Sequence, residues 1–288
     1  MSKGGEDSSE LIVYYPNQKA EAGFLSTCVI MFRNIVEGRE LIWQMFKRDF
    51  FIHYRRSILG YMWVFLAPIL GIITWVFMNY TGILNPGDME MPYPVFVLLG
   101  SQMWGLFMGF LTSASGSLTM AGGLMKQIRF EHEVLLVKQA AMVLANFLMT
   151  LIIVFVVMLV FKVVPPWQAV FFPVVALPLF FLGAGVGLVV SVFSAVFVDA
   201  SQIVARIVGL AMYLTPVIYT AEFEHPALKL VVKYNPLSYL ISACRDILTT
   251  GTIANFPQYL VASGITLAVF LIGLRLFFVS EPLVAEKL

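Results

Sequence analysis

Long apolar runs separated by short polar segments dominate the chain. A helix needs about 20 mainly apolar residues to cross the hydrocarbon core of a bilayer. Six runs meet this requirement: residues 57–80, 95–118, 139–161, 168–198, 203–221 and 257–279. The pattern therefore predicts an all-α integral membrane protein with six transmembrane helices.

A seventh apolar patch, about 237–248, is too short to cross a bilayer and contains Arg245 and Asp246. Irregular or short segments at membrane depth must be buried in protein or face water. We therefore expect this patch to dip into the membrane or to lie on its surface.

The distribution of lysine and arginine predicts the orientation, because these residues collect on the cytoplasmic side of membrane proteins. With six crossings both termini share a side, and 14 of the 18 basic residues fall on it. The four on the other side are Lys162, Lys229, Lys233 and Arg245. Both termini are predicted to be cytosolic, which places Cys28 and Cys244 on opposite sides, where they cannot pair.

The segment 37–56, before the first run, has the pattern of a basic amphipathic helix. One arc of a helical wheel, mostly apolar, holds Ile42, Met45, Phe46, Phe50, Ile52 and His53, with Asp49 and Phe51 as imperfections of the pattern. The polar arc holds Gln44, Lys47, Arg48 and Arg55. Such a helix is suited to the headgroup layer. It is either an anchor alone or a platform that also touches a cytosolic partner, with Trp43, Lys47, Arg48, Arg55 and Arg56 as the residues we expect to define it.

Small residues recur every four positions in two of the runs. The second run carries Ser101, Gly105, Gly109, Ser113 and Ser117, and the fourth carries Gly183, Gly187, Ser191 and Ala195. A step of four keeps them on one helix face, where another backbone can approach closely. The stripes indicate helix packing, and the alternative is that part of one lines a path or a seam between subunits.

Composition excludes several classes of function. The chain is 60% apolar and 12% charged, with a net charge of +1, whereas soluble domains carry about 25% charged residues. The two cysteines and three histidines do not have metal-ligand spacing, so we expect no metal site. Neither a nucleophile elbow nor a phosphate-binding loop motif occurs, and the runs almost lack ionisable groups. We expect no catalytic residues and no enzyme activity, so the energy for any transport must come from elsewhere.

Three motifs resemble those of type 2 ABC transporter permeases. Residues 54–68 read YRRSILGYMWVFLAP, similar to the Y-[RK]-x-[ST]-x-L-G-x-x-W-x-x-L-x-P signature that opens the first span. Residues 214–219 read LTPVIY, and residues 235–240 read NPLSYL, followed by Arg245. Their order and spacing are similar to those of the exporters of polysaccharides and polyol phosphates, which carry O-antigen, capsule and teichoic acid.

Two departures fall where the resemblance places the ATPase contact. The family often has F-P-x-E in its main cytosolic loop, and this chain has FEHE at residues 130–133. The family also commonly has R-D after the fourth span, where this chain has Val198 and Asp199.

The resemblance implies a homodimer with a cytosolic ATP-binding subunit on each copy, which binds ATP and Mg while this chain holds no cofactor. The loop 120–138 is then the coupling segment, and 222–255 forms re-entrant helices near the outer mouth. A dense mixture of charges supports a coupling role, against the alternative of a merely solvated loop. The expected ATPase contacts are Lys126, Gln127, Arg129, Phe130, Glu131, His132 and Glu133. The expected outer gate residues are Pro216, Tyr219, Asn235, Pro236, Arg245 and Asp246.

The chain accordingly divides into a cytosolic N-terminal segment (1–56), a six-span domain (57–279) and a cytosolic tail (280–288). We expect a permease subunit that exports a lipid-linked polysaccharide or polyol-phosphate polymer across the bacterial cytoplasmic membrane. Aromatic rings can stack on sugar faces, and the candidates for the path are Trp63, Trp75, Tyr80 and Trp104. The alternative for each ring is an interfacial belt. Export of a drug or small lipid is the alternative function, and an intramembrane transferase or a passive channel belongs to a different class.

Overall fold

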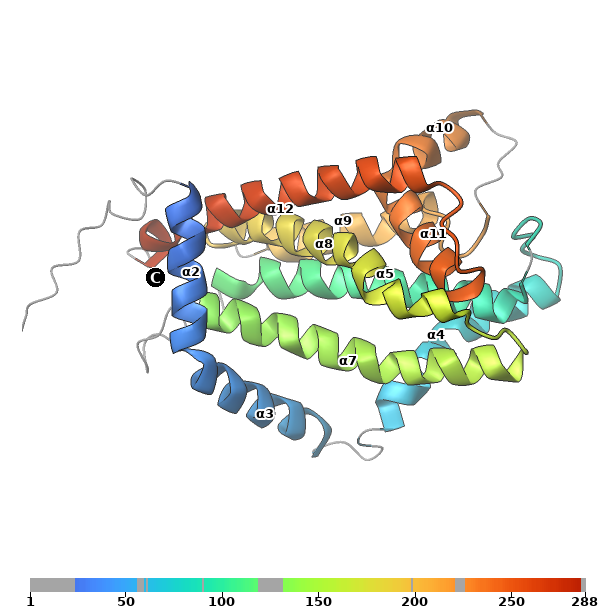
Figure 1. The fold of residues 1–288 in the computed structure, drawn as a ribbon, viewed down its shortest axis with the longest axis horizontal. Helices are drawn as coiled ribbons and strands as arrows, with labels where there is room; N and C mark the ends of the chain where they lie inside the picture. Colours follow the sequence, from blue (N-terminus) through green and yellow to red (C-terminus); the bar gives the residue numbers. More distant parts are fainter. Residues whose placement is uncertain are drawn as a thin grey trace, which may run out of the picture.

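The computed structural model describes residues 24–55, 60, 62–89, 91–118, 132–197, 199–220 and 226–285. Regular secondary structure in these ranges is entirely helical. Long helices lie side by side along the long axis, α2 crosses one end of them, and α10 and α11 lie at the other end (Figure 1). We call these the α2 end and the α11 end. The helix that finishes the described chain returns to the α2 end.

The helices and their bounds are α2 (Phe24–Glu37), α3 (Arg39–Arg55), α4 (Met62–Tyr80), α5 (Tyr93–Ser115), α7 (His132–Val160), the 3-10 helix η1 (Trp167–Phe171), α8 (Phe172–Ser194), α9 (Ala200–Leu210), the 3-10 helix η2 (Ala211–Leu214), α10 (Pro226–Tyr234), α11 (Pro236–Thr249) and α12 (Phe256–Ala285).

Five helical segments are long and apolar enough to cross a membrane. They are α4, α5, α7, η1 with α8, and α12, with mean hydropathies between 1.6 and 2.9. They coincide with five of the six predicted runs, so the expectation of an all-helical membrane protein is confirmed at this level. The third run begins earlier than predicted, because residues 132–138, expected in the coupling loop, form the first turns of α7.

The predicted fifth run, 203–221, is shorter in the structure. Its helix begins at Ala200 and ends at Leu214, which gives a length of about 22 Å, less than the hydrocarbon core of about 30 Å. Thr215 is extended, with φ −123° and ψ 139°, because the ring of Pro216 disfavours helical geometry in the residue before it. A sixth crossing is therefore not among the helices that qualify by length.

Helix α5 is the centre of the bundle. About two thirds of the residues in the apolar cores of α5 and α8 are buried, against 11% for α4 and 22% for α7 and α12. Val97, Leu99, Met103 and Leu111 of α5 are completely buried. The outer helices instead direct apolar side chains away from the protein, as expected for surfaces that face lipid or another subunit.

Glycines bring the backbones of α5 and α8 together. A Cβ atom on Gly183 or Gly187 would lie 2.5 Å from the carbonyl oxygen of Phe107 or Leu111, respectively. The close approach predicted from the stripe of the fourth run is therefore present. The stripe of the second run is mixed, because a Cβ on Gly105 would meet nothing within 4 Å, whereas one on Gly109 would lie 2.9 Å from Cγ1 of Val143 in α7.

The amphipathic helix predicted over 37–56 corresponds to α3, which starts after Gly38. At Gly38 the chain passes close to α7, and an added Cβ would lie 2.6 Å from Cγ2 of Val134. On α3, Met45 is buried, whereas Phe51 and Ile52 are about half exposed. The sequence analysis did not predict α2, whose apolar side chains are too few for a span.

We expect Gly187→Ala to destabilise the protein by about 1–3 kcal/mol, because the new methyl group overpacks the α5–α8 contact against backbone atoms. The unfolding temperature in detergent should fall by several degrees. Gly264→Ala on α12 is the matched control, since its Cβ would meet nothing within 4 Å. Equal unfolding temperatures for both variants would contradict this account of the packing.

Candidate functional site

The first polar cluster of the candidate site surrounds Arg245 of α11. Its Nη2 donates hydrogen bonds to the carbonyl oxygens of Pro216 (3.1 Å) and Val217 (3.3 Å). The guanidinium carbon lies 3.6 Å from the ring centroid of Phe96 in α5, and the side chain is buried. The guanidinium group thus provides hydrogen-bond donors for two carbonyl groups that lie outside any helix, because the helix ends after η2. One residue joins α11, α5 and the segment after η2.

Gly100 of α5 leaves room for this cluster. A Cβ at this position would clash with the carbonyl oxygen of Val217 and would lie 2.6 Å from Nη2 of Arg245. A side chain at position 100 would therefore displace Arg245 or the 216–217 backbone. The sequence analysis did not single out this glycine.

Asn235 links the same segment to the start of α11. As the N-cap residue, its Oδ1 accepts a hydrogen bond from the backbone N–H of Leu237 at 3.0 Å, a favoured role for asparagine. Its Nδ2 donates to Oγ1 of Thr215 at 2.9 Å. Pro236 occupies the first turn of α11, where its missing N–H costs nothing. Two motifs that are separate in sequence, 214–219 and 235–240, are thus bonded to each other.

Two further contacts extend the cluster to neighbouring segments. The Tyr93 hydroxyl donates to the carbonyl oxygen of Ile218 at 3.0 Å. Thr220 bonds to the carbonyl oxygen of Pro86 through both its backbone N–H and its hydroxyl. The segment 215–220 is therefore held against α5, α11 and the loop that follows α4.

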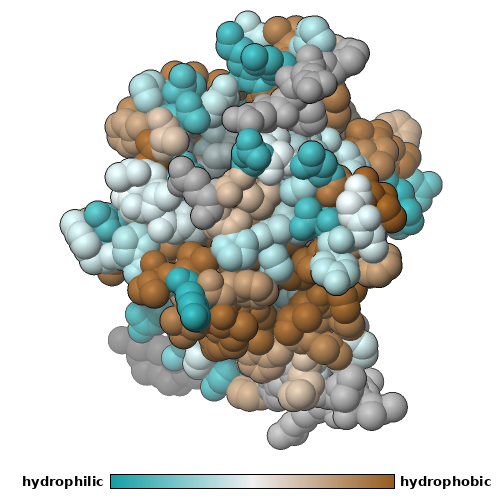
Figure 2. Space-filling view, turned by 90° about the vertical axis from the view of Figure 1, so that its right-hand side faces the viewer, coloured by the Kyte–Doolittle hydropathy of each residue, from teal (hydrophilic) through white to brown (hydrophobic). Residues whose placement is uncertain are grey.

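The structure brings together only part of the predicted set of gate residues. Pro216, Asn235 and Arg245 meet as described, whereas the Tyr219 hydroxyl donates to the carbonyl oxygen of Tyr213. Asp246 is directed elsewhere, and its Oδ2 accepts a hydrogen bond from the N–H of Ala254 at 3.1 Å. The α11 end carries hydrophilic residues at its top and across its middle, with hydrophobic residues below them (Figure 2).

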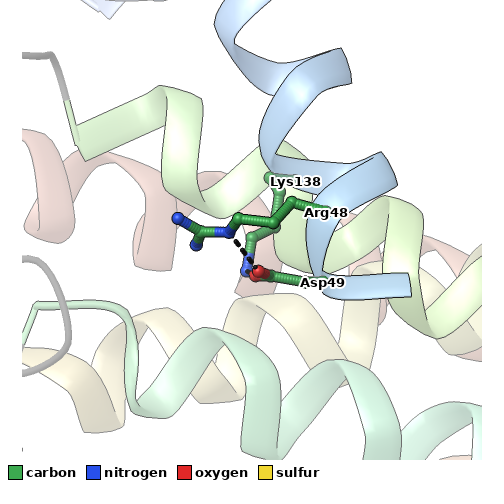
Figure 3. A network of polar contacts seen from close by, with 3 residues as sticks. All are labelled: Arg48, Asp49 and Lys138. Carbon is green, nitrogen blue, oxygen red and sulfur yellow. Dashed lines mark hydrogen bonds and ion pairs between the residues drawn. The ribbon is translucent and has the colours of Figure 1, made fainter. Parts of the chain in front are cut away.

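The second polar cluster lies near the α2 end and joins α3 to α7. Nζ of Lys138 lies 2.7 Å from Oδ2 of Asp49, and Nε of Arg48 lies 2.9 Å from Oδ1. Figure 3 shows both cations converging on the carboxylate. The Lys138 side chain is only 7% exposed, so its charge depends on this partner.

The same contacts determine the ionisation of Asp49. Partial burial by itself raises the pKa of this carboxyl group. The hydrogen bonds from Lys138 and Arg48, and then their positive charges, outweigh the burial and hold the pKa of Asp49 below its ordinary value of 3.8. Asp49 is therefore ionised at neutral pH.

Most of the predicted ATPase contacts lie within residues 119–131, which are outside the described part of the chain. His132 is the first residue of α7. Glu133 is 1% exposed and, with Met31 of α2 and Leu274 of α12, lines a mainly apolar cavity of about 250 Å³. Its side chain thus faces the interior of this chain, unlike the surface contact that was expected, because α2 packs over the start of α7.

Comparison with known proteins agrees with these motifs and their placement. The sequence profile of the ABC-2 type transporter family matches residues 40–249, a range that contains both clusters. The chain belongs to the ABC-2 type transporter family.

Relatives of this ABC-2 chain include permease proteins named for O-antigen export. The O-antigen export system permease protein RfbA of Klebsiella pneumoniae is 26% identical over 80% of this chain and 88% of its own length. The protein of the same name from Myxococcus xanthus is 26% identical over 75% of this chain and 82% of its own length. The ABC-2 chain is a multi-pass membrane protein, in agreement with its apolar helices.

The predicted interface residues of the ABC-2 chain lie on an accessible helix. Trp43 of α3 is 56% exposed, and Nζ of Lys47 lies 5.3 Å from its ring centroid. Trp43 stacks on Phe46 with a centroid separation of 5.7 Å. The side chain of Arg55 and all of Arg56 lie outside the described part of the chain.

The four predicted path residues have different environments. Trp63 and Tyr80, near the two ends of α4, are 46% and 89% exposed. Trp75 packs edge-on against Tyr213 of η2, with centroids 6.1 Å apart. Trp104 is buried against Phe107, so it does not face an open path in this structure.

Sequence reasoning missed one contact between α12 and α2. Nη1 of Arg275 donates to Oγ1 of Thr27 at 2.6 Å, which ties the two ends of the described chain together. No local pattern predicts a bond between residues so far apart in sequence. Cys244 is a free, buried thiol, so an external reagent would not report its side of the membrane.

We expect Arg245→Met to destabilise the ABC-2 chain by about 2 kcal/mol, because two buried carbonyl groups lose their donor and the ring loses its cation. The unfolding temperature in detergent should fall by about 5 °C. Lys229→Met on α10 is the control, because Lys229 is exposed. An unchanged unfolding temperature for Arg245→Met would show that the cluster does not hold the α11 end together.

We expect Asp49→Asn to cost about 3 kcal/mol at pH 7, because it leaves the nearly buried Lys138 without its counter-charge. A lowered pKa stabilises the folded state above the unfolded value of 3.8, and this contribution disappears as the pH falls through the lower folded pKa. The difference in unfolding temperature between wild type and Asp49→Asn should therefore be complete at pH 7 and shrink below about pH 4. Asp88→Asn, at an exposed loop position, should change little. A pH-independent difference would argue against the ion pair.

Proposed function

We propose that the chain is the transmembrane permease subunit of an ATP-driven exporter for a lipid-linked polysaccharide or polyol-phosphate polymer. The observation that carries the proposal is the similarity to O-antigen export permeases, which extends over 75–80% of this chain and 82–88% of the relatives. Similarity over nearly the whole length favours a shared architecture over a single shared motif. Membership of the ABC-2 family supports the same conclusion.

In this proposal the chain performs no chemistry. A separate cytosolic ATP-binding subunit binds ATP and Mg and supplies the energy. The scarcity of charged side chains within the apolar helices supports this division, because proton- or ion-coupled carriers use ionisable groups at membrane depth.

The α2 end is cytosolic in this proposal, within the bacterial cytoplasmic membrane. The excess of basic residues on the side of the termini supports the orientation. The sixth crossing is then completed by α9 and η2 together with the non-helical segment 215–220. This non-helical stretch can lie within a membrane because its polar groups have hydrogen-bond partners in the protein. Arg245 and Tyr93 donate to its carbonyl oxygens, and Asn235 donates to the hydroxyl of Thr215. The short helices α10 and α11 form the re-entrant cap at the outer side.

The ATPase contacts the coupling segment and the accessible face of α3, including Trp43 and Lys47. The ion pair of Lys138 with Asp49 supports coupling, because it joins α3 to the start of α7. A displacement of the coupling segment by the ATPase would therefore reach both the interface helix and a long membrane helix.

Two copies of the chain enclose the passage, with α4, α5 and α9 nearest to it. The long exposed apolar face of α4, with Ile73 and Phe77 at 56% and 61% exposure, supports a contact with a second copy or with lipid. The exposed ring of Trp63 is placed to guide sugars by stacking, worth about 0.5–1.5 kcal/mol for each ring.

The deciding experiment deletes the gene for this chain in its host and restores it from a plasmid. In the deletion strain, surface polymer should be lost and lipid-linked polymer should accumulate inside the cell, because synthesis continues without export. The wild-type chain should restore surface polymer. The double variant Trp63→Leu with Trp75→Leu should restore it only partly, because the helices remain hydrophobic but lose their stacking rings.

Trp167→Leu is the matched control, since Trp167 is 74% exposed on η1 and lies outside the proposed passage. The comparison requires that each variant is present in the membrane in the same amount as wild type. It also requires that each variant co-purifies with the same amount of the ATPase. Normal surface polymer in the deletion strain, together with new sensitivity to a drug, would support export of a small molecule instead.

A further inference from the structure

Helix α10 packs against the rest of the chain along one edge only. It comprises nine residues, Pro226–Tyr234, and Val232 is its only buried side chain. Figure 1 shows α10 outside the row of long helices, at the end of the bundle where α12 begins. The helix is about 14 Å long, so it is too short to cross a bilayer. A helix of this length is marginal in water without packing, so α10 needs a partner beyond the contact at Val232.

The apolar side chains of α10 extend well beyond its buried edge. On a helical wheel, with about 100° for each residue, Val232 lies at one margin of an apolar arc. The rest of that arc includes Leu228, Val231, Tyr234 and Leu230. Leu230 and Tyr234 are 58% and 74% exposed, and Val231 is 42% exposed. The face of α10 that points away from the protein is therefore apolar.

Two lysines occupy the remaining side of α10. Lys229 and Lys233 are the only charged residues of this helix, and both are exposed. They are four residues apart, so their side chains lie on the same side of the helix. Nζ of Lys233 lies 6.0 Å from the ring centroid of Tyr234, at the border of the apolar arc. Glu222 and Glu224 precede the helix in sequence and lie outside the described residues.

A positive edge beside an apolar face fits the boundary between lipid headgroups and hydrocarbon. At this boundary the apolar side chains of an amphipathic helix enter the acyl region, and its lysines keep their ammonium groups among the phosphates. Tyrosine is enriched at the same depth. A second copy of α10 fits this face less well, because a shared apolar contact would bring the lysine pairs of both copies together.

We propose that α10 lies in the headgroup layer of the leaflet at the α11 end. Lys229 and Lys233 bind the phosphate groups of anionic phospholipids, and Leu230 and Tyr234 enter the hydrocarbon. The inference goes beyond the proposed function and depends on it only for the name of the leaflet, which is then the outer one. The Tyr239 hydroxyl of α11 donates to the carbonyl oxygen of Lys233 at 2.8 Å. The lipid contact of α10 therefore also fixes the position of α11 relative to the membrane surface.

The first test measures the depth of α10 with a spin label on the full chain in nanodiscs. Leu230→Cys carries the label in a Cys28→Ser background, and Cys244 is retained because its thiol is buried. The label should be accessible to oxygen, which partitions into lipid, and shielded from a water-soluble nickel chelate. Asp88→Cys is the matched control, because Asp88 is exposed in the loop after α4. Its label should show the opposite preference.

The second test measures the contribution of the lysines. The label at position 230 is compared in nanodiscs of phosphatidylcholine alone and of phosphatidylcholine mixed equally with phosphatidylglycerol. Near an anionic surface each lysine should favour the inserted state of the label by about fivefold. Lys229→Gln with Lys233→Gln should abolish the preference for phosphatidylglycerol. Lys162→Gln is the matched control and should keep it, because Lys162 is an exposed lysine after α7 and outside α10.

The reagents distinguish the possible surroundings of α10. A label at position 230 that the nickel chelate reaches means that the helix projects into water. A label shielded from both reagents means that a protein surface, such as a second copy, covers the face. Either result overturns the inference, as does an equal preference for phosphatidylglycerol in wild type and the double lysine variant.

These measurements need neither the ATPase nor a glycan, so their failure leaves the proposed function standing. A deletion strain that keeps its surface polymer would instead overturn the proposed function, and the lipid contact of α10 would remain.

Discussion

Buried polar groups must find their partners within the protein, and the α11 end of this chain is organised by that constraint. The helix formed by α9 and η2 ends before Pro216, which leaves the carbonyl groups of residues 216 and 217 outside any helix. Arg245 reaches them because Phe96 supports its guanidinium group and Gly100 adds no side chain in its way. The position of α11 follows from these contacts.

Helix α5 connects this end to the rest of the bundle, and its faces have different roles. The face toward α8 is packed backbone against backbone at Gly183 and Gly187, which makes the pair a rigid unit. The face toward α7 leaves a groove of about 250 Å³, which is lined by small, polar and apolar residues of both helices. A rigid contact on one side allows the other side to remain open without loss of the fold, because the stability comes from the buried face.

The α2 end combines a small buried apolar cluster, formed by Ala114, Leu118, Leu188 and Phe277, with polar bonds between helices. Asp49 joins α3 to α7 and Arg275 joins α12 to α2. In the proposed function, a movement of α3 would shift the start of α7 through the ion pair of Asp49 with Lys138.

The sequence by itself determined the helical class, five of the membrane helices and the family, because the length of an apolar run and a short motif are local properties. The end of η2 could also be predicted from the sequence, since Thr215 precedes a proline. Tertiary structure decided which side chains meet. Glu133 and Trp104 are turned into the core by helices distant in sequence, and the bonds from Arg245 to Pro216 and from Lys138 to Asp49 join different helices. Hydrophobic periodicity shows which face of a helix is apolar, but only packing selects the neighbour that covers it.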